Sequence, residues 1–270
     1  MTTMAARTAR PESLPADVRL TNAVAYAIFA LAALVLLAAA LAWVARQPAF
    51  ALRELTVDGD VVRAAEPALR AAAAPYLATG FFALDLAAMR AAFESVPWVR
   101  QAVVRRVWPD RVRVTLVEHQ AVALWAGDDG NERLVNTHGE VFEANVGDVE
   151  DENLPRFEGP DGSAARMLAM HDALAPALAP MRSRIETLRV SARGSWRVAL
   201  DSGATIELGR GQPPDETAEV RARAERFVRT VAHVGQHYQR RLLHADLRHA
   251  DGYAVRLEGI TTTATPSTPR

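Results

Sequence analysis

The sequence contains 270 residues, which is long for one folded domain and short for three. Half of the residues are apolar, which excludes an intrinsically disordered chain, and the net charge of -1 argues against a general nucleic-acid-binding protein. Because the sequence has no cysteine, it can form no disulfide, no thiolate metal site and no cysteine nucleophile.

A short polar segment, residues 1–22, precedes a run over 23–44 that contains no charge, proline or glycine. As a helix this run would be about 33 Å long, enough to cross a hydrocarbon core of about 30 Å. Tyr26 and Trp43 stand near its ends, where aromatic rings favour the headgroup region. A cleaved signal peptide is the alternative, but its apolar region spans only about 7 to 15 residues. We therefore predict an uncleaved transmembrane helix over 23–44.

The orientation of this helix is weakly encoded, because three arginines precede it and three follow it closely. A short head is more easily left in the cytoplasm than a domain of about 200 residues. We therefore predict a single-pass type II arrangement, with a cytoplasmic head over 1–22 and the bulk of the chain in the periplasm.

Residues 50–119 predict strand, helix, helix, strand and strand in that order. The first strand alternates apolar and polar residues up to the turn pair Asp58-Gly59. An alanine-rich helix follows over 64–76, and Asp85 is the predicted N-cap of a second helix. Two alternating segments flank the turn 108–110 and predict a half-buried hairpin.

Residues 120–258 are predicted to be richer in strands. Short apolar segments between polar turns predict a meander over 124–142 and a hairpin over 196–208. Ser163 is the predicted N-cap of one helix. A longer helix with a core-facing apolar stripe follows the proline pair at 213–214.

The chain is predicted to end in a hairpin over 243–257 and a disordered tail over 259–270. The predicted fold class is therefore α+β. It consists of one transmembrane helix, a β-α-α-β-β domain and a mixed β-rich domain with flanking helices.

The chemical motifs in the sequence are incomplete. His233 and His237 lie four residues apart, but valine at 234 breaks the His-Glu-x-x-His pattern of zinc proteases. Residues 128–132 are rich in oxygen ligands but lack the alternating spacing of a calcium loop. We predict that the protein is not an enzyme and has no metal site, cofactor or small-molecule substrate.

Several short motifs follow the predicted span in a fixed order. They are Gly80-Phe81-Phe82-x-Leu84-Asp85, Pro97-Trp98-Val99-Arg100, Val104-Arg105-Arg106-x-Trp108-Pro109-Asp110, Val117-Glu118-His119-x-x-x-Ala123-x-Trp125, Ala192-Arg193-x-Ser195-Trp196, Asp246-Leu247-Arg248 and Gly252-x-Ala254-Val255. In this order, after a single span, they resemble the FtsQ/DivIB family of bacterial cell-division proteins.

The resemblance covers about residues 20–258 and implies a POTRA domain over 50–119 and an FtsQ-type β domain over 120–258. Members of the family are inner-membrane scaffolds of the divisome at the division septum, and they are not enzymes. Their β domain binds FtsB, and through it FtsL, while the POTRA domain and the span help to localise them. The implied contact residues in this sequence belong to the last hairpin, with one further candidate before it: Arg248, His249, Asp251, Gly252, Tyr253, Ala254, Val255, Leu257 and Arg193.

The sequence departs from the family pattern at some of these positions. It has His249 where many relatives have tyrosine, Leu257 where some have tryptophan, and Gly194 where some have a second arginine. Arg193 is a candidate substitute for that arginine. Tyr253 and Leu257 share one face of the strand, and the sequence leaves open whether this face is core or contact surface.

Strand addition gives such a contact a physical basis. A terminal hairpin ends a sheet, so its last strand presents unpaired backbone groups to another chain. Arg248 could pair bidentately with a partner carboxylate, although an ordinary exposed arginine is the simpler alternative.

A different function remains open from the sequence, that of a POTRA-type periplasmic chaperone or assembly factor for outer-membrane or secreted proteins. Such a factor would need several POTRA-like units, or a barrel built from alternating segments of about ten residues. The sequence predicts neither.

Overall fold

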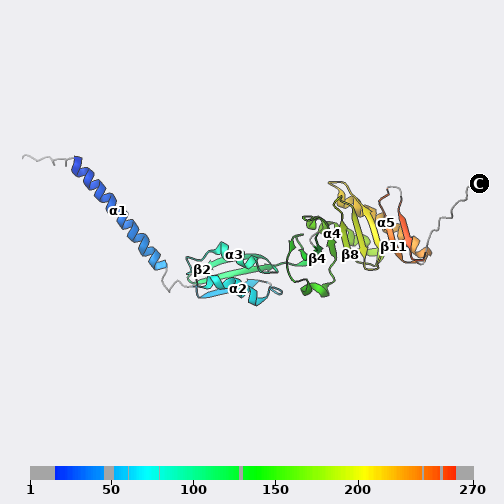
Figure 1. The fold of residues 1–270 in the computed structure, drawn as a ribbon, viewed down its shortest axis with the longest axis horizontal. Helices are drawn as coiled ribbons and strands as arrows, with labels where there is room; N and C mark the ends of the chain where they lie inside the picture. Colours follow the sequence, from blue (N-terminus) through cyan, green and yellow to red (C-terminus); the bar gives the residue numbers. More distant parts are fainter. Residues whose placement is uncertain are drawn as a thin grey trace, which may run out of the picture.

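The computed structural model describes residues 16–45, 52–59, 61–78, 80–127, 130–238, 240–249 and 252–259. Of the positions singled out above, residues 1–15, 128–129, Asp251, 260–270 and the side chains of His233 and His237 lie outside this part of the chain. One long helix is followed by two folded units in chain order (Figure 1).

Helix α1, Ala16–Ala45, contains the predicted span and begins seven residues before it. The stretch Leu20–Val44 is long and apolar enough to cross a membrane, and none of its apolar window is buried inside the protein. An apolar helix with no protein surface to cover it is typical of a membrane span.

The first folded unit, named here the three-stranded unit, has the predicted element order. Its elements are β1 (Glu54–Gly59), α2 (Glu66–Leu77), α3 (Leu86–Glu94), β2 (Val99–Val107) and β3 (Arg111–Glu118). The sheet order is β1-β3-β2, with β3 parallel to β1 and antiparallel to β2. Alternation along β3 buries Val112, Val114 and Leu116 in the core of this unit.

The two predicted helix caps have different outcomes. Asp85 caps α3 as predicted, because its Oδ1 accepts hydrogen bonds from the backbone N–H groups of Ala87 (2.9 Å) and Ala88 (3.0 Å). Ser163 occupies the predicted N-cap position, directly before the helix Ala164–Leu178, but its side chain makes no capping bond. Its backbone is already helical at φ -88° and ψ -2°, and its hydroxyl donates to the Pro160 carbonyl at 2.6 Å instead of accepting from the helix.

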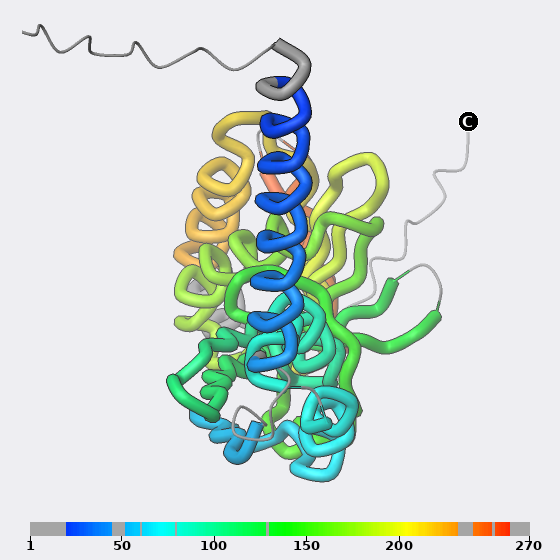
Figure 2. The backbone as a smooth tube through the Cα atoms, turned by 90° about the vertical axis from the view of Figure 1, so that its left-hand side faces the viewer, coloured from blue at the N-terminus to red at the C-terminus, as the bar shows by residue number. Residues whose placement is uncertain are grey.

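The second folded unit, the nine-stranded unit, is one mixed sheet with the order β12-β11-β10-β9-β8-β7-β4-β5-β6. The strands are β4 (Ala121–Ala126), β5 (Glu132–Asn136), β6 (Val141–Phe142), β7 (Arg156–Glu158), β8 (Ile185–Val190), β9 (Trp196–Leu200), β10 (Thr205–Gly209), β11 (Leu242–Asp246) and β12 (Ala254–Leu257). Helices α4 (Ala164–Leu178) and α5 (Glu216–Tyr238) pack on one face of the sheet (Figure 2). The predicted meander, the predicted hairpin over 196–208 and the terminal hairpin are all present.

Strands β7 and β8 were not predicted, and they join the two halves of this sheet. Strand β7 has three residues and lies parallel to both β4 and β8. Strand β8 buries Ile185, Leu188 and Val190, whose unequal spacing hides the period of two. Without these two strands the sequence predicts separate hairpins instead of one continuous sheet.

Candidate functional site

The terminal hairpin places β12 at one end of the sheet order. β12 pairs antiparallel with β11, and β11 in turn pairs parallel with β10. No other strand in the described part of the chain pairs with β12. One row of its backbone groups is therefore available to another chain.

The side chains of this hairpin divide between two faces. The ring of Tyr253 packs edge-on against Phe227 of α5, with 5.1 Å between the ring centroids, and Leu257 is buried. Val255 also packs against the core, whereas Ala254 and Arg256 are exposed. The face that the sequence left open is therefore core, and Tyr253 packs the hairpin against α5.

Arg248 is already paired within the chain. Its guanidinium donates to Asp246 through Nε (2.9 Å to Oδ1) and Nη2 (2.6 Å to Oδ2), and its backbone N–H donates to Oδ1 at 3.0 Å. The hydrogen bonds from the Arg248 side chain lower the pKa of Asp246 to about 2. A partner carboxylate would have to share this exposed guanidinium with Asp246.

A basic cleft lies beside the hairpin, between α5 and the start of β12. It has a volume of about 240 Å³ and is lined by His249, Gly252, Tyr253 and two arginines of α5, Arg223 and Arg226, among others. His249 and Gly252 are both exposed. The loop residues predicted as contacts thus border a positively charged recess.

Arg193 is exposed but lies apart from this cluster. It belongs to the turn between β8 and β9, and β9 is separated from β12 by two strands. At about 4.8 Å per strand, that places β9 about 14 Å from β12. The neighbouring Gly194 has φ +76°, a left-handed conformation in which an arginine side chain would be strained. This explains why the sequence has glycine there.

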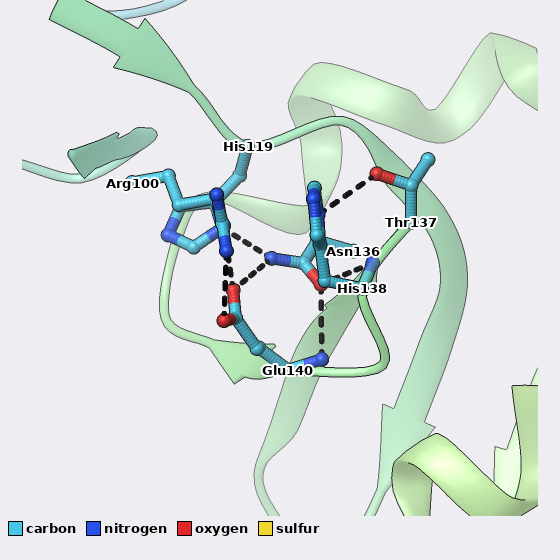
Figure 3. A network of polar contacts seen from close by, with 6 residues as sticks. All are labelled: Arg100, His119, Asn136, Thr137, His138 and Glu140. Carbon is cyan, nitrogen blue, oxygen red and sulfur yellow. Dashed lines mark hydrogen bonds and ion pairs between the residues drawn. The ribbon is translucent and has the colours of Figure 1, made fainter.

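A second polar constellation, which the sequence did not reveal, joins the two folded units (Figure 3). Arg100 of β2 donates to Glu140 through Nε (2.8 Å) and Nη2 (3.1 Å). Buried Asn136 of β5 contacts Glu140 Oε2 at 2.6 Å and His119 Nδ1 at 2.9 Å, and its Oδ1 accepts the backbone N–H of His138. The one feature of the sequence that could have indicated this site is the polar Asn136 directly after the apolar pair Leu134-Val135 of a predicted strand.

Apolar and aromatic packing completes this contact between the two units, which is named here the joint. Trp98, at φ +72°, is buried with its indole N–H on Asp148 (3.0 Å) and its ring edge-on to Phe142, 5.3 Å between centroids. The His119 ring stacks on Phe142 at 4.0 Å, and the Arg63 guanidinium lies 4.8 Å from the centre of the Trp98 ring. The two units therefore share a packed interface and not merely a connecting segment.

Two groups in the joint have lowered pKa values. Partial burial lowers the pKa of His119 below its ordinary 6.5. Hydrogen bonds from Arg100 and then Asn136 lower the pKa of Glu140 from 4.5 to about 2. Both shifts mean that the unfolded chain binds protons more readily than the folded one.

The joint is therefore expected to weaken in acid, first through His119. The contribution of His119 to the unfolding free energy is fully present above pH 6.5, the pKa of the unfolded chain. It is lost as the pH falls from there through the pKa of folded His119, which is lower. Thermal unfolding from pH 7.5 to 5.5 should show a falling Tm. His119→Gln, which keeps an acceptor for Asn136, should reduce this slope, and an unchanged slope would contradict the assignment.

The described residues contain no group of three or more His, Asp or Glu side chains that could hold a metal ion. The described residues define a class of protein with an apolar helix long enough to span a membrane, a β-α-α-β-β unit and a mixed sheet whose last strand has no described strand on its outer side. Residues 50–119 match the family model for the FtsQ-type POTRA domain. Residues 123–248 match the model for the C-terminal region of the cell division protein FtsQ/DivIB.

Several relatives named cell division protein FtsQ are similar over most of the chain. The one from Burkholderia pseudomallei is 41% identical over 244 residues, 90% of this chain and 94% of the relative. Those from Thiomonas arsenitoxydans and Bordetella pertussis are each 36% identical, covering 93% and 89% of this chain and 91% and 92% of their own lengths. The chain belongs to the FtsQ/DivIB family of cell division proteins, and the predicted POTRA-containing α+β fold is confirmed.

Proposed function

We propose that this protein is a non-enzymatic scaffold of the divisome that binds FtsB, and through it FtsL, by strand addition to β12. The protein is anchored in the inner membrane by α1, with its N-terminus in the cytoplasm and both folded units in the periplasm at the septum. The observation that carries the proposal is the position of β12, the last strand of a nine-stranded sheet, with no described neighbour on its outer side.

Backbone pairing alone gives this contact modest affinity. Strand β12 has four residues, and each hydrogen bond contributes about 0.5–1.5 kcal/mol net. Side chains beside the edge must supply the remainder. The basic cleft and the exposed guanidinium of Arg248 suit a partner segment that carries acidic residues.

Copurification from detergent extracts tests the proposed function. The full-length protein should retain FtsB and FtsL, whereas retention of outer-membrane assembly components instead would favour the chaperone alternative. Truncation after Arg241 is a poor control, because β11 carries buried Ala245 and is followed by buried Leu247. Point variants in the hairpin keep the core intact.

Arg248→Ala is expected to weaken capture of FtsB about tenfold or more, since a hydrogen bond to a charged group contributes about 1.5–3 kcal/mol. Asp246→Asn is the matched variant, because it removes the competing internal carboxylate and should leave capture unchanged or stronger. Affinity measurements on both variants separate two roles for Arg248. Equal weakening of FtsB capture by both variants would mean that Arg248 only stabilises the loop through its pair with Asp246.

A further inference from the structure

One end of the three-stranded unit receives the chain from α1, and the turn 108–110 lies at that end. The backbone N–H of Arg53 donates to the Asp110 carbonyl at 3.0 Å, and Glu54 pairs in register with Arg111. In Figure 1 the chain enters the unit at the end that faces α1 and leaves it at the end that faces the nine-stranded unit.

The connection to the apolar helix is short. Helix α1 ends at Ala45, and Leu52 is the next described residue. Seven Cα–Cα steps separate them and can span at most about 25 Å. The turn 108–110 is therefore held close to the surface of any bilayer that α1 crosses.

This end of the unit carries exposed aromatic side chains. Trp108 is 73% exposed, whereas the other tryptophans of the two folded units, Trp98, Trp125 and Trp196, are each at most 3% exposed. Phe82 is 51% exposed in the loop after α2. An indole ring has an apolar body and a polar N–H, a combination suited to the headgroup region of a membrane.

Contacts made by Arg106 bring the loop that carries Phe82 to this end. Arg106 lies one residue before the end of β2, and its guanidinium donates to the carbonyls of Phe81 (3.0 Å) and Leu84 (2.6 Å). Phe82 and Trp108 therefore belong to the same end of the unit.

The same end of the unit carries several arginines. Arg105 is exposed and forms no ion pair within the described part of the chain, and Arg111 lies 3.8 Å from Glu54 and 4.0 Å from Asp110. With Arg53 and Arg106, four arginines lie at this end beside three carboxylates, those of Glu54, Asp110 and Asp85. A net positive surface with an exposed tryptophan fits anionic phosphates above an apolar layer.

We propose that this tip, defined as Phe82, Arg105, Trp108 and Arg111, docks on the periplasmic surface of the bilayer that α1 crosses. The indole of Trp108 enters the headgroup region, and the arginines contact anionic lipid phosphates. The proposal rests on the membrane anchoring proposed above and is independent of partner binding at β12. Docking would fix the three-stranded unit relative to the membrane, with the nine-stranded unit at its opposite end.

Depth-dependent quenching by brominated lipids tests the proposal on the full-length protein in nanodiscs of phosphatidylethanolamine and phosphatidylglycerol. Trp43 lies in the apolar helix, so the background is Trp43→Phe, which leaves Trp108 as the exposed tryptophan. We expect brominated lipids to quench part of the emission of this variant. That quenching should be lost in the double variant with Trp108→Phe.

A matched control moves the exposed indole to the other end of the unit. Val62 is 86% exposed, and its N–H donates to Glu118 at the end of β3, away from the turn 108–110. Val62→Trp in the double variant should restore emission without lipid quenching. Equal quenching from this position would indicate unspecific contact and overturn the docked orientation.

Further outcomes separate docking from anchoring. Loss of quenching on Trp43→Phe alone, with no remaining lipid-dependent signal, would overturn docking while leaving the span intact. If wild-type protein shows no quenching from Trp43 either, the anchoring itself fails. Arg105→Glu, or removal of phosphatidylglycerol, should reduce the Trp108 signal; no change in either case would overturn the role of anionic lipid.

Discussion

Val255→Pro is expected to abolish capture of FtsB by a protein that is still folded. The Leu247 N–H donates to the Glu207 carbonyl of β10, so the backbone groups of Asp246 and of its partner Ala254 face each other, and those of Val255 face the open edge. Proline at this position removes an N–H from the edge and places its ring where an added strand would lie, while it keeps an apolar side chain at a half-buried position. Capture is measured by copurification from detergent, and the fold by thermal unfolding.

The control for this variant is Ala254→Pro, because the N–H of Ala254 faces Asp246 of β11. Ala254→Pro should lower the Tm as well as capture, whereas Val255→Pro should lower capture alone. Unchanged capture by Val255→Pro would count against strand addition. An equal fall in Tm for the two variants would contradict the assigned direction of these amides.

The register can be measured because the chain contains no cysteine. Arg256 is exposed on β12, so Arg256→Cys gives a single reactive thiol at the edge. Residues opposite each other on paired strands have Cβ atoms about 4.5–5.5 Å apart, close to disulfide geometry. Disulfide formation should peak at the one partner position that lies opposite residue 256, because positions two residues away are about 7–8 Å from it. A helical or featureless pattern would contradict a paired strand.

The sequence predicted those elements whose local pattern is strong. The cap at Asp85 and the alternation along β3 are local features that tertiary contacts do not alter. The terminal hairpin was predicted for the same reason. Its edge position was expected from its place as the last hairpin, but the parallel pairing of β11 with β10 could not be predicted, because sheet order depends on pairing between distant segments.

The joint between the units was missed for a related reason. Arg100, His119 and Glu140 are ordinary polar residues in sequence, and only the fold brings them onto Asn136. The pairing of Arg248 with Asp246 is different, because it joins residues only two positions apart, and the sequence analysis considered this guanidinium only as a partner-binding or an ordinary exposed group. Long-range polar networks leave little periodic signal.

The joint also affects the orientation of the open edge of β12 relative to the membrane. A packed interface fixes the nine-stranded unit on the three-stranded one, so β12 is carried at the end away from the span (Figure 1). If the unit also docks on the bilayer through Trp108, the partner strand meets an edge of defined orientation. A flexible connection would instead present the edge in many orientations and add an ordering cost to each capture.

Phe227→Ala is expected to cost about 3–5 kcal/mol of unfolding free energy, because it empties a core position on α5. Phe227 is 1% exposed, and its ring is the surface on which Tyr253 packs. For a chain of this size the loss corresponds to a fall in Tm of about 6–20 °C. Thermal unfolding measures it directly.

The effect should be largest at the hairpin, because Tyr253 precedes β12 and loses its only ring partner among the described residues. Amide hydrogen exchange should quicken in β12 more than in β4 or β9, and FtsB capture should weaken with it. Phe227→Leu keeps most of the apolar volume and should show a smaller loss of both. If Phe227→Ala lowers Tm while exchange in β12 and capture stay at the wild-type level, then the hairpin is held by its strand pairing with β11 and not by α5.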